Sequence, residues 1–121
     1  NHVLVAYDGS LPSIRILEYL LGQSAFGVLE VSILVVSKAA KDRLGQEQRS
    51  FIMSLNQRNQ SINFIDATGD PKDQIIKRLR HQRYDMLAIG AYGHSKLRQL
   101  FIGSTTSALI HASPVPVLLS K

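Results

Sequence analysis

The 121-residue sequence predicts one α/β domain, residues 1–121, with a five-stranded parallel sheet between two layers of helices. Short apolar segments rich in β-branched residues alternate with segments of helical period, which indicates βαβ units. One apolar segment, Val28–Val36, is nearly all apolar in its later half. Such a strand is covered on both faces, as in a parallel sheet. The right-handedness of βαβ crossovers leaves few topologies open.

The first half of the chain predicts three strands and two helices. His2–Tyr7 forms the first strand, which Asp8-Gly9-Ser10 ends. A helix follows from Pro12, because proline suits a first helical turn. The buried face of this helix is predicted from spacings of three and four residues at Ile14, Leu17, Leu20 and Leu21. Val28–Val36 is the second strand. A polar helix within Lys38–Asn59, with Leu44, Phe51, Ile52 and Leu55 on one face, then leads to a third strand, Ser61–Asp66.

The second half predicts two helices and two strands. Asp70 is a helix cap, with Pro71 in the first turn and Ile75, Ile76 and Leu79 facing the core. Tyr84–Ile89 is the fourth strand. The last helix covers Ser104–Ala112, with Ala108, Leu109 and Ala112 facing inward. Pro114–Leu119 is the fifth strand, which Pro116 places at a sheet edge.

Composition excludes several classes of protein. The chain has no cysteine, so a disulfide scaffold, a thiolate metal site and a cysteine nucleophile are excluded. No apolar run approaches a membrane span, and the first residues enter a strand without the pattern of a signal peptide. We therefore expect a cytoplasmic protein without membrane contact. The net charge of +5 leaves an anionic partner open.

Two strand ends carry residues suited to binding. In open parallel sheets, ligands gather beyond the carboxyl ends of the strands, where the strand order reverses. Asp8-Gly9-Ser10 follows the first strand, and the segment Gly90–Thr106 follows the fourth. Gly103-Ser104-Thr105-Thr106 leads into a helix whose free N–H groups favour a phosphate. A tight turn with an ordinary helix cap is the structural alternative.

This second segment resembles the ATP-binding signature of the universal stress protein family. Gly90, two residues, Gly93, nine residues and then Gly103-Ser104 reproduce that spacing. The opening VLVAYDGS, Gly69-Asp70-Pro71 and the closing SPVPVLL also resemble the family, in the expected order over the whole chain. No Walker sequence and no G-x-G-x-x-G turn after the first strand competes with this assignment.

The resemblance implies a Rossmann-like sandwich of three layers, α/β/α, similar to the adenine nucleotide α hydrolases, with strand order 3-2-1-4-5. It also implies an adenine nucleotide (ATP, ADP or AMP), with any Mg²⁺ or Mn²⁺ held by the phosphates rather than by a protein site. Asp8 would lie near the adenosine, and the backbone at Val36 would contact adenine. Ile89 and Gly90 would border the ribose and phosphates. The residues so implied for ATP binding are Ala6, Tyr7, Asp8, Val36, Ile89, Gly90, Gly93, His94, Gly103, Ser104 and Thr105.

Several of these residues have a structural alternative. Asp8 can instead stabilise its turn or cap a helix, and His94 can be an exposed loop residue. Lys96 and Arg98 suit a solvated basic rim that attracts ATP. The basic run Lys77–Arg83 complements a helix C-terminus. No aromatic residue interleaves with that run, so we expect no nucleic-acid binding.

The function expected from the resemblance is a nucleotide-binding stress-response module that acts through dimerisation and partner proteins. We expect a homodimer through the fifth strand, at Val115, Val117 and Leu119. No acid–base pair with catalytic spacing is evident, so an enzyme is not expected beyond slow ATP hydrolysis. A dimerisation module without nucleotide, or a weak ATP hydrolase, remains the alternative. Some family members carry two such domains, and the chain is compatible with being one of a tandem pair.

Overall fold

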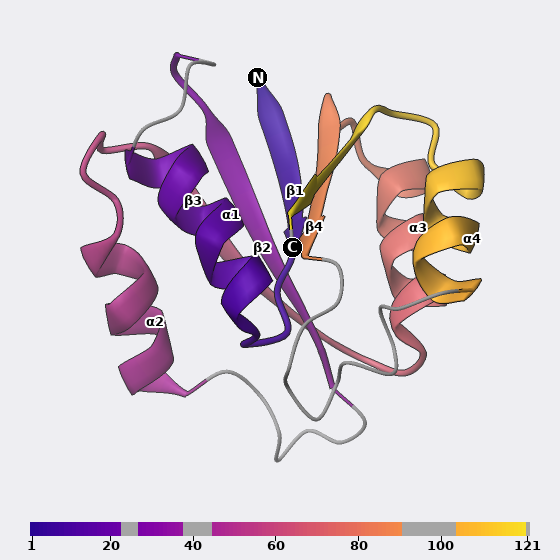
Figure 1. Cartoon of the computed structure of the whole chain (residues 1–121), viewed down its shortest axis with the longest axis horizontal. Coiled ribbons are helices and arrows are strands. Elements are labelled where there is room, and N and C mark those ends of the chain that lie inside the picture. The colour runs from indigo at the N-terminus through magenta and orange to yellow at the C-terminus, as the bar shows by residue number, and fades with distance from the viewer. Residues whose placement is uncertain (23–26, 38–44, 91–103, 121) are drawn as a thin grey trace.

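The strands of the computed structural model form a five-stranded parallel sheet in the order β3-β2-β1-β4-β5. The structure describes residues 1–22, 27–37, 45–90 and 104–120. Helices α1 and α2 cover one face of the sheet, and α3 and α4 cover the other (Figure 1). The predicted fold class and strand order are therefore confirmed. The strands are β1 (His2–Ala6), β2 (Glu30–Ser37), β3 (Ser61–Thr68), β4 (Met86–Gly90) and β5 (Val117–Ser120). The helices are α1 (Leu11–Gly22), α2 (Gln46–Ser54), α3 (Pro71–His81) and α4 (Ser104–Ala112).

Alternation along the strands divides the core into two layers. In β1, Val3 and Val5 face α1 and α2, whereas Leu4 and Ala6 face α3 and α4. All residues of β2 after Glu30 are buried, which confirms the prediction of a strand covered on both faces. Burying apolar surface on both faces stabilises the sheet by roughly 25 cal/mol per Å². The central strands therefore hold the strand ends in fixed register.

Helix α3 begins as its sequence predicts. The Asp70 side chain accepts a hydrogen bond from the Asp73 backbone N–H at 3.1 Å, and Pro71 occupies the first turn. Ile75 and Leu79 are buried against the sheet, whereas Ile76 is only partly buried. The cap and the apolar face together fix the direction in which α3 crosses the sheet.

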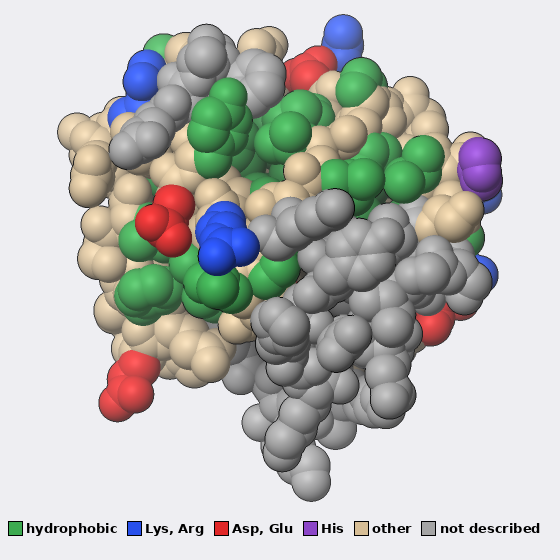
Figure 2. Space-filling view, viewed as in Figure 1, with side chains coloured by type: hydrophobic (Ala, Val, Ile, Leu, Met, Phe, Trp, Pro, Cys, Tyr) green, Lys and Arg blue, Asp and Glu red, His purple; other side chains and the backbone are tan. Residues whose placement is uncertain are grey.

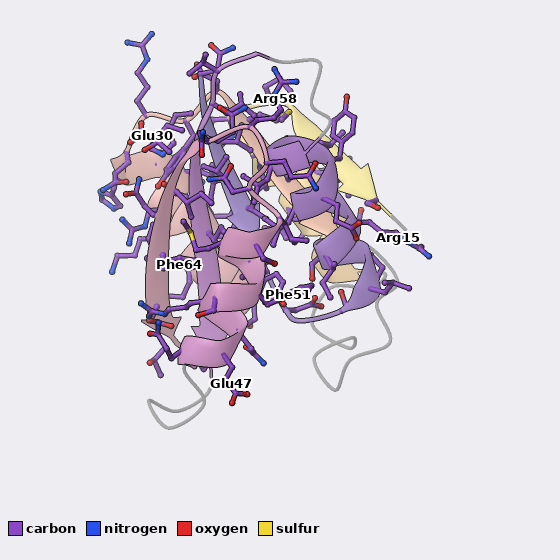
Figure 3. All side chains as sticks on the ribbon, turned by 90° about the vertical axis from the view of Figure 1, so that its left-hand side faces the viewer. Arg15, Glu30, Glu47, Phe51, Arg58 and Phe64 are labelled. Carbon is purple, nitrogen blue, oxygen red and sulfur yellow. The ribbon has the colours of Figure 1, made fainter. Side chains whose placement is uncertain are left out.

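Two inward-facing predictions are wrong. Phe51 was expected on the buried face of α2, but its side chain is 44% exposed, and Figure 3 labels it on that helix. Its neighbour Ile52 is fully buried instead, because adjacent helical residues point about 100° apart. Ala112 was expected to face inward and is exposed, whereas Leu109 is buried as predicted. Leu44 lies outside the described residues.

All five strands differ from the prediction in at least one bound, and β3 and β5 show the physical reasons. β3 continues to Thr68 because its pairing with β2 extends to Ser37 opposite Thr68. β5 begins only at Val117, since Pro114 and Pro116 have no N–H to give to a ladder. Pro116 still takes part through its carbonyl, which accepts from the Leu87 N–H at 2.9 Å. Its predicted edge position is confirmed by the strand order.

Candidate functional site at the carboxyl ends of the strands

The strand order reverses between β1 and β4, and the candidate residues gather there. β1 pairs with β2 on one side and with β4 on the other, so Ala6 lies opposite both Leu34 and Ile89. Asp8 follows β1 directly, and Gly90 is the last residue of β4. The structure therefore brings Ala6, Asp8, Ile89 and Gly90 to one edge of the sheet.

A glycine turn shapes the end of β1. The Tyr7 N–H donates to the Leu34 carbonyl at 2.9 Å, so pairing with β2 continues one residue beyond the strand. Gly9 has a backbone φ of +78°, which residues other than glycine rarely adopt. Ser10 directly precedes α1. Its carbonyl accepts hydrogen bonds from the Ile14 N–H at 3.0 Å and from the Ser13 hydroxyl at 2.8 Å. The turn places the Asp8 carboxylate beside the helix start.

The two carboxylate oxygens of Asp8 have different environments. Oδ1 accepts the Ser10 N–H at 2.9 Å, which is the turn-stabilising role. Oδ2 is buried and has no hydrogen-bond partner within the described part of the chain. A buried carboxylate oxygen without a donor costs stability, about 1–3 kcal/mol or more for a charged group. A ligand hydroxyl or amide that donates to Oδ2 would remove that cost.

The sequence prediction missed a second buried oxygen at this edge. Ser37 is the last residue of β2, and its hydroxyl oxygen is buried without a partner among the residues that the structure describes. Its backbone carbonyl accepts a hydrogen bond from the Gly69 N–H at 3.1 Å. The side-chain hydroxyl takes no part in that bond and is available to a ligand. The available signal was a polar residue directly after the apolar run Val31–Val36.

Val36 and Ile89 lie at this edge with their side chains turned inward. Val36 is 7% exposed and Ile89 fully buried, and both belong to the core layer under α3 and α4. Their side chains therefore serve packing, and a ligand at this edge reaches these residues through their backbone. The backbone contact to adenine that the resemblance implied for Val36 stays a prediction.

Gly90 is explained by packing in this structure. A Cβ built at Gly90 would lie 2.6 Å from the Ser13 backbone nitrogen and 2.9 Å from Pro12 atoms. The absent side chain thus lets the start of α1 approach the end of β4. Its φ is not in the left-handed region. The predicted ligand contact of Gly90 stays a prediction.

Tyr7 gives the edge a buried phenol. Its side chain is only 5% exposed and packs in the core layer under α1 and α2. Burial raises the pKa of Tyr7, and the neighbouring negative charge of Asp8 raises it further. The phenol is therefore neutral at ordinary pH, and its hydroxyl can donate a hydrogen bond.

The predicted phosphate residues are described only in part. Gly93, His94 and Gly103 lie outside the described residues, as do Lys96 and Arg98. Ser104 and Thr105 are the first residues of α4, whose N-terminus lies toward the same end of the sheet as Asp8 (Figure 1). A helix start here is the feature that the sequence predicted for an anion.

The described residues show neither a cluster of metal ligands nor a membrane-spanning helix. They contain no group of three or more His, Cys, Asp or Glu side chains that could hold a metal ion. None of the described helices is long and apolar enough to cross a bilayer.

Known proteins resemble this chain along its whole length. The model of the universal stress protein family matches residues 1–121. Universal stress protein Slr1230 of Synechocystis sp. is 32% identical over 121 residues, which cover 96% of this chain and 41% of that protein. Universal stress protein MJ0577 of Methanocaldococcus jannaschii is 26% identical over 97 residues, 77% of this chain and 60% of the relative. The chain thus spans less than two thirds of either relative.

Solved structures share the fold. The structure of MJ0577 superposes with a TM-score of 0.75 at 21% identity and covers 100% of this chain and 95% of that one. An Arabidopsis thaliana family member with AMP bound gives a TM-score of 0.70 at 18% identity, covering 98% of this chain and 90% of the other. A universal stress protein in complex with cAMP gives 0.72 at 20% identity, covering 98% and 94%.

Proposed function

The chain belongs to the universal stress protein family, and from that membership we propose that it binds an adenine nucleotide at the carboxyl ends of β1, β2 and β4. The observation that carries the proposal is Asp8 Oδ2, a buried carboxylate oxygen to which no described residue donates, at the point where the strand order reverses. A ribose hydroxyl or an adenine amine supplies such a donor. Family structures with AMP, cAMP and dAMP support the choice of an adenine nucleotide.

The proposed binding mode divides the nucleotide between two kinds of protein group. The adenosine lies against the Asp8 turn and the backbone at Val36, and Ser37 offers a hydroxyl to the base or ribose. The phosphates, with any Mg²⁺ or Mn²⁺ they carry, lie at Gly93, His94 and the Gly103-Ser104-Thr105 turn. ATP is the expected nucleotide, with ADP and AMP as competitors. The site binds its nucleotide as a signal rather than as a substrate for rapid hydrolysis.

Calorimetry and mass spectrometry test this proposal. We expect adenine nucleotide to co-purify with the protein, and ATP titrated into nucleotide-free protein to bind. A Gly103→Val variant should weaken ATP more than adenosine, because a side chain there blocks only the phosphates. Absence of binding at millimolar ATP would refute the proposal. Steady phosphate release that Asp8→Ala abolishes would favour the weak-hydrolase alternative instead.

A homodimer through β5 is the second part of the proposed function. β5 pairs with β4 on one side, and no described strand lies on the other. Its Leu119 is 44% exposed, beside a hollow of about 310 Å³ between α1 and β5 lined by Arg15, Ile16, Tyr19, Leu118, Leu119 and Ser120. Figure 2 views the side on which α1 and β5 lie in front and shows hydrophobic side chains gathered there. An exposed apolar edge strand favours pairing with a second copy.

Sedimentation at tens of micromolar protein tests the dimer. We expect a dimer for the natural chain and a monomer for Leu119→Glu, which places a charge on the edge strand β5. Leu11→Glu is the matched control, since Leu11 is 49% exposed on α1 and outside β5. A monomeric natural chain would refute the dimer.

We also propose that residues 1–121 form one cytoplasmic stress protein domain. The family match over this whole range supports a single domain. The span of 41% of the Synechocystis relative leaves room for a second domain in a longer protein.

A further inference from the structure

A groove between α3 and α4 is lined by four charged side chains, three of them basic. Its volume is about 440 Å³. All of its lining residues belong to α3 and α4, whereas Asp8 follows β1 and Gly90 ends β4. The lining residues, here called the α3–α4 groove, are Lys72, Asp73, Ile76, Lys77, Arg80, His81, Ala108 and Ala112.

The rim of the α3–α4 groove is basic and unpaired. Lys72, Lys77 and Arg80 are all exposed, and no ion pair joins any of them to an acidic side chain in the described residues. Asp73 is the only acid that lines the groove. Lys72 and Arg80 stand eight residues apart with Ile76 between them, so they share one helical row.

Helix stability accounts for only part of this charge. Cations in the last turn of α3 complement the helix dipole, which explains Arg80 and His81. Lys72 is in the first turn, where the positive end of the dipole disfavours a cation. Lys77 lies in the middle, outside the range of either effect. The helix dipole therefore does not account for the two lysines.

The floor of the groove is apolar. Ile76 and Ala108 are partly exposed, and Ala112 is exposed. The two alanines have small side chains, so α4 leaves space on this side of the groove. A partner's apolar side chain can enter that space between the helices. None of the described residues that line the groove is Phe, Tyr or Trp, which disfavours stacking of nucleic-acid bases.

We propose that the α3–α4 groove docks an acidic amphipathic helix of a partner protein. Its glutamates and aspartates would face Lys72, Lys77 and Arg80, and its apolar residues would pack on Ile76 and the two alanines. Charge complementarity of this kind sets the rate and specificity of association, and an apolar row in a groove is a common way to bind a helix. The proposal is independent of nucleotide binding.

Fluorescence anisotropy with a labelled peptide tests the proposal. The probe is a peptide of about four helical turns with leucine at positions i, i+4 and i+7 and glutamate elsewhere. We expect binding that weakens as NaCl rises from ~0.05 to ~0.3 M, because salt screens exposed charges. The double variant Lys77→Glu, Arg80→Glu should bind about tenfold or more weakly. Arg58→Glu is the control, since Arg58 is exposed and lies on the α1–α2 side (Figure 3).

A second variant tests the floor without changing charge. Ala112→Leu fills the exposed end of the groove and should weaken the peptide severalfold while circular dichroism and ATP binding stay unchanged. A scrambled peptide of equal charge, without an apolar row, should bind more weakly than the probe. Three results would each overturn the proposal: no peptide binding at low salt, an equal loss in Arg58→Glu, or tighter binding of a labelled nucleic-acid duplex than of the peptide.

Discussion

The carboxyl edge of the sheet and the α3–α4 groove hold their polar groups in opposite ways. At the edge, Asp8 Oδ2 and the Ser37 hydroxyl are buried and have no hydrogen-bond partner in the described segments. In the groove, Lys72, Lys77 and Arg80 are exposed to water. The carboxyl edge has a few buried polar groups in fixed positions, whereas the groove has three exposed cations on long, flexible side chains.

This difference determines what each region can recognise. Electrostatic interactions are strong where water is excluded and weak where water screens them. The edge therefore suits a small molecule with one matching donor pattern, and its binding should depend little on salt. The groove suits a larger acidic partner, and its binding should depend steeply on salt. Substitutions at the carboxyl edge and at the start of α3 should therefore have separate effects.

The largest effect is expected at Gly90, which holds the edge together. Gly90→Ala forces a Cβ within 2.6 Å of the Ser13 nitrogen, and overpacking of this kind costs roughly 1–3 kcal/mol of unfolding free energy. Gly22→Ala is the matched control, because its Cβ meets nothing closer than 3.9 Å. Urea denaturation measures both. Equal stabilities for Gly90→Ala and the natural chain would show that α1 does not need this close approach.

Asp8→Ala should separate binding from folding. Loss of the carboxylate removes the acceptor for the nucleotide, and a fall of about tenfold in affinity corresponds to roughly 1.4 kcal/mol. The stability of the apo protein should change little, because removal of the unpartnered buried Oδ2 offsets the loss of the hydrogen bond from the Ser10 N–H to Oδ1. Calorimetry and urea denaturation on the same sample give both values. Unchanged nucleotide affinity would place the ligand elsewhere.

Asp70→Ala should give the reverse pattern at the start of α3. Asp70 caps the helix through the Asp73 N–H, and loss of such a cap costs about 1 kcal/mol. Because Asp70 has no proposed nucleotide contact, ATP affinity should stay the same. A large loss of ATP affinity in this variant would contradict the separation of the two regions.

The smallest expected effect is on the alkaline limb of stability. The raised pKa of Tyr7 means that folding favours the neutral phenol. Its contribution is complete below the ordinary pKa of 10.0 and is lost as pH rises through the higher folded value. Tyr7→Phe should therefore lose less stability than the natural chain above that pH. Tyr19→Phe, at an exposed site, should follow the natural chain.

Most of the fold was predictable because the apolar pattern is unambiguous. The bounds of α4 and the cap of α3 agree with the structure, since Asp70-Pro71 and Gly103-Ser104 mark helix starts by local chemistry. Strand ends were less predictable, because the length of β3 depends on its pairing with β2. Phe51 was assigned to the wrong face of α2 because periodicity does not distinguish it from its neighbour Ile52.

The candidate site was predictable only in outline. Asp8 was predicted because a charged residue directly after an apolar strand is conspicuous. The Ser37 hydroxyl was missed because its only signal, a polar residue directly after an apolar run, does not reveal whether the hydroxyl finds a partner. The packing role of Gly90 depends on how close α1 comes to β4, and no local sequence pattern encodes that distance.

An NMR titration of ¹⁵N-labelled protein with ATP tests the central claim most directly. The account predicts saturable shifts in the backbone amides at Tyr7–Ser10, Ser37 and Gly90, persisting at ~0.3 M NaCl, where exposed charges are strongly screened. Shifts confined to Lys72–Arg83 that vanish at that salt concentration would contradict it. They would mean that ATP meets this chain only as a counterion of the basic helix α3.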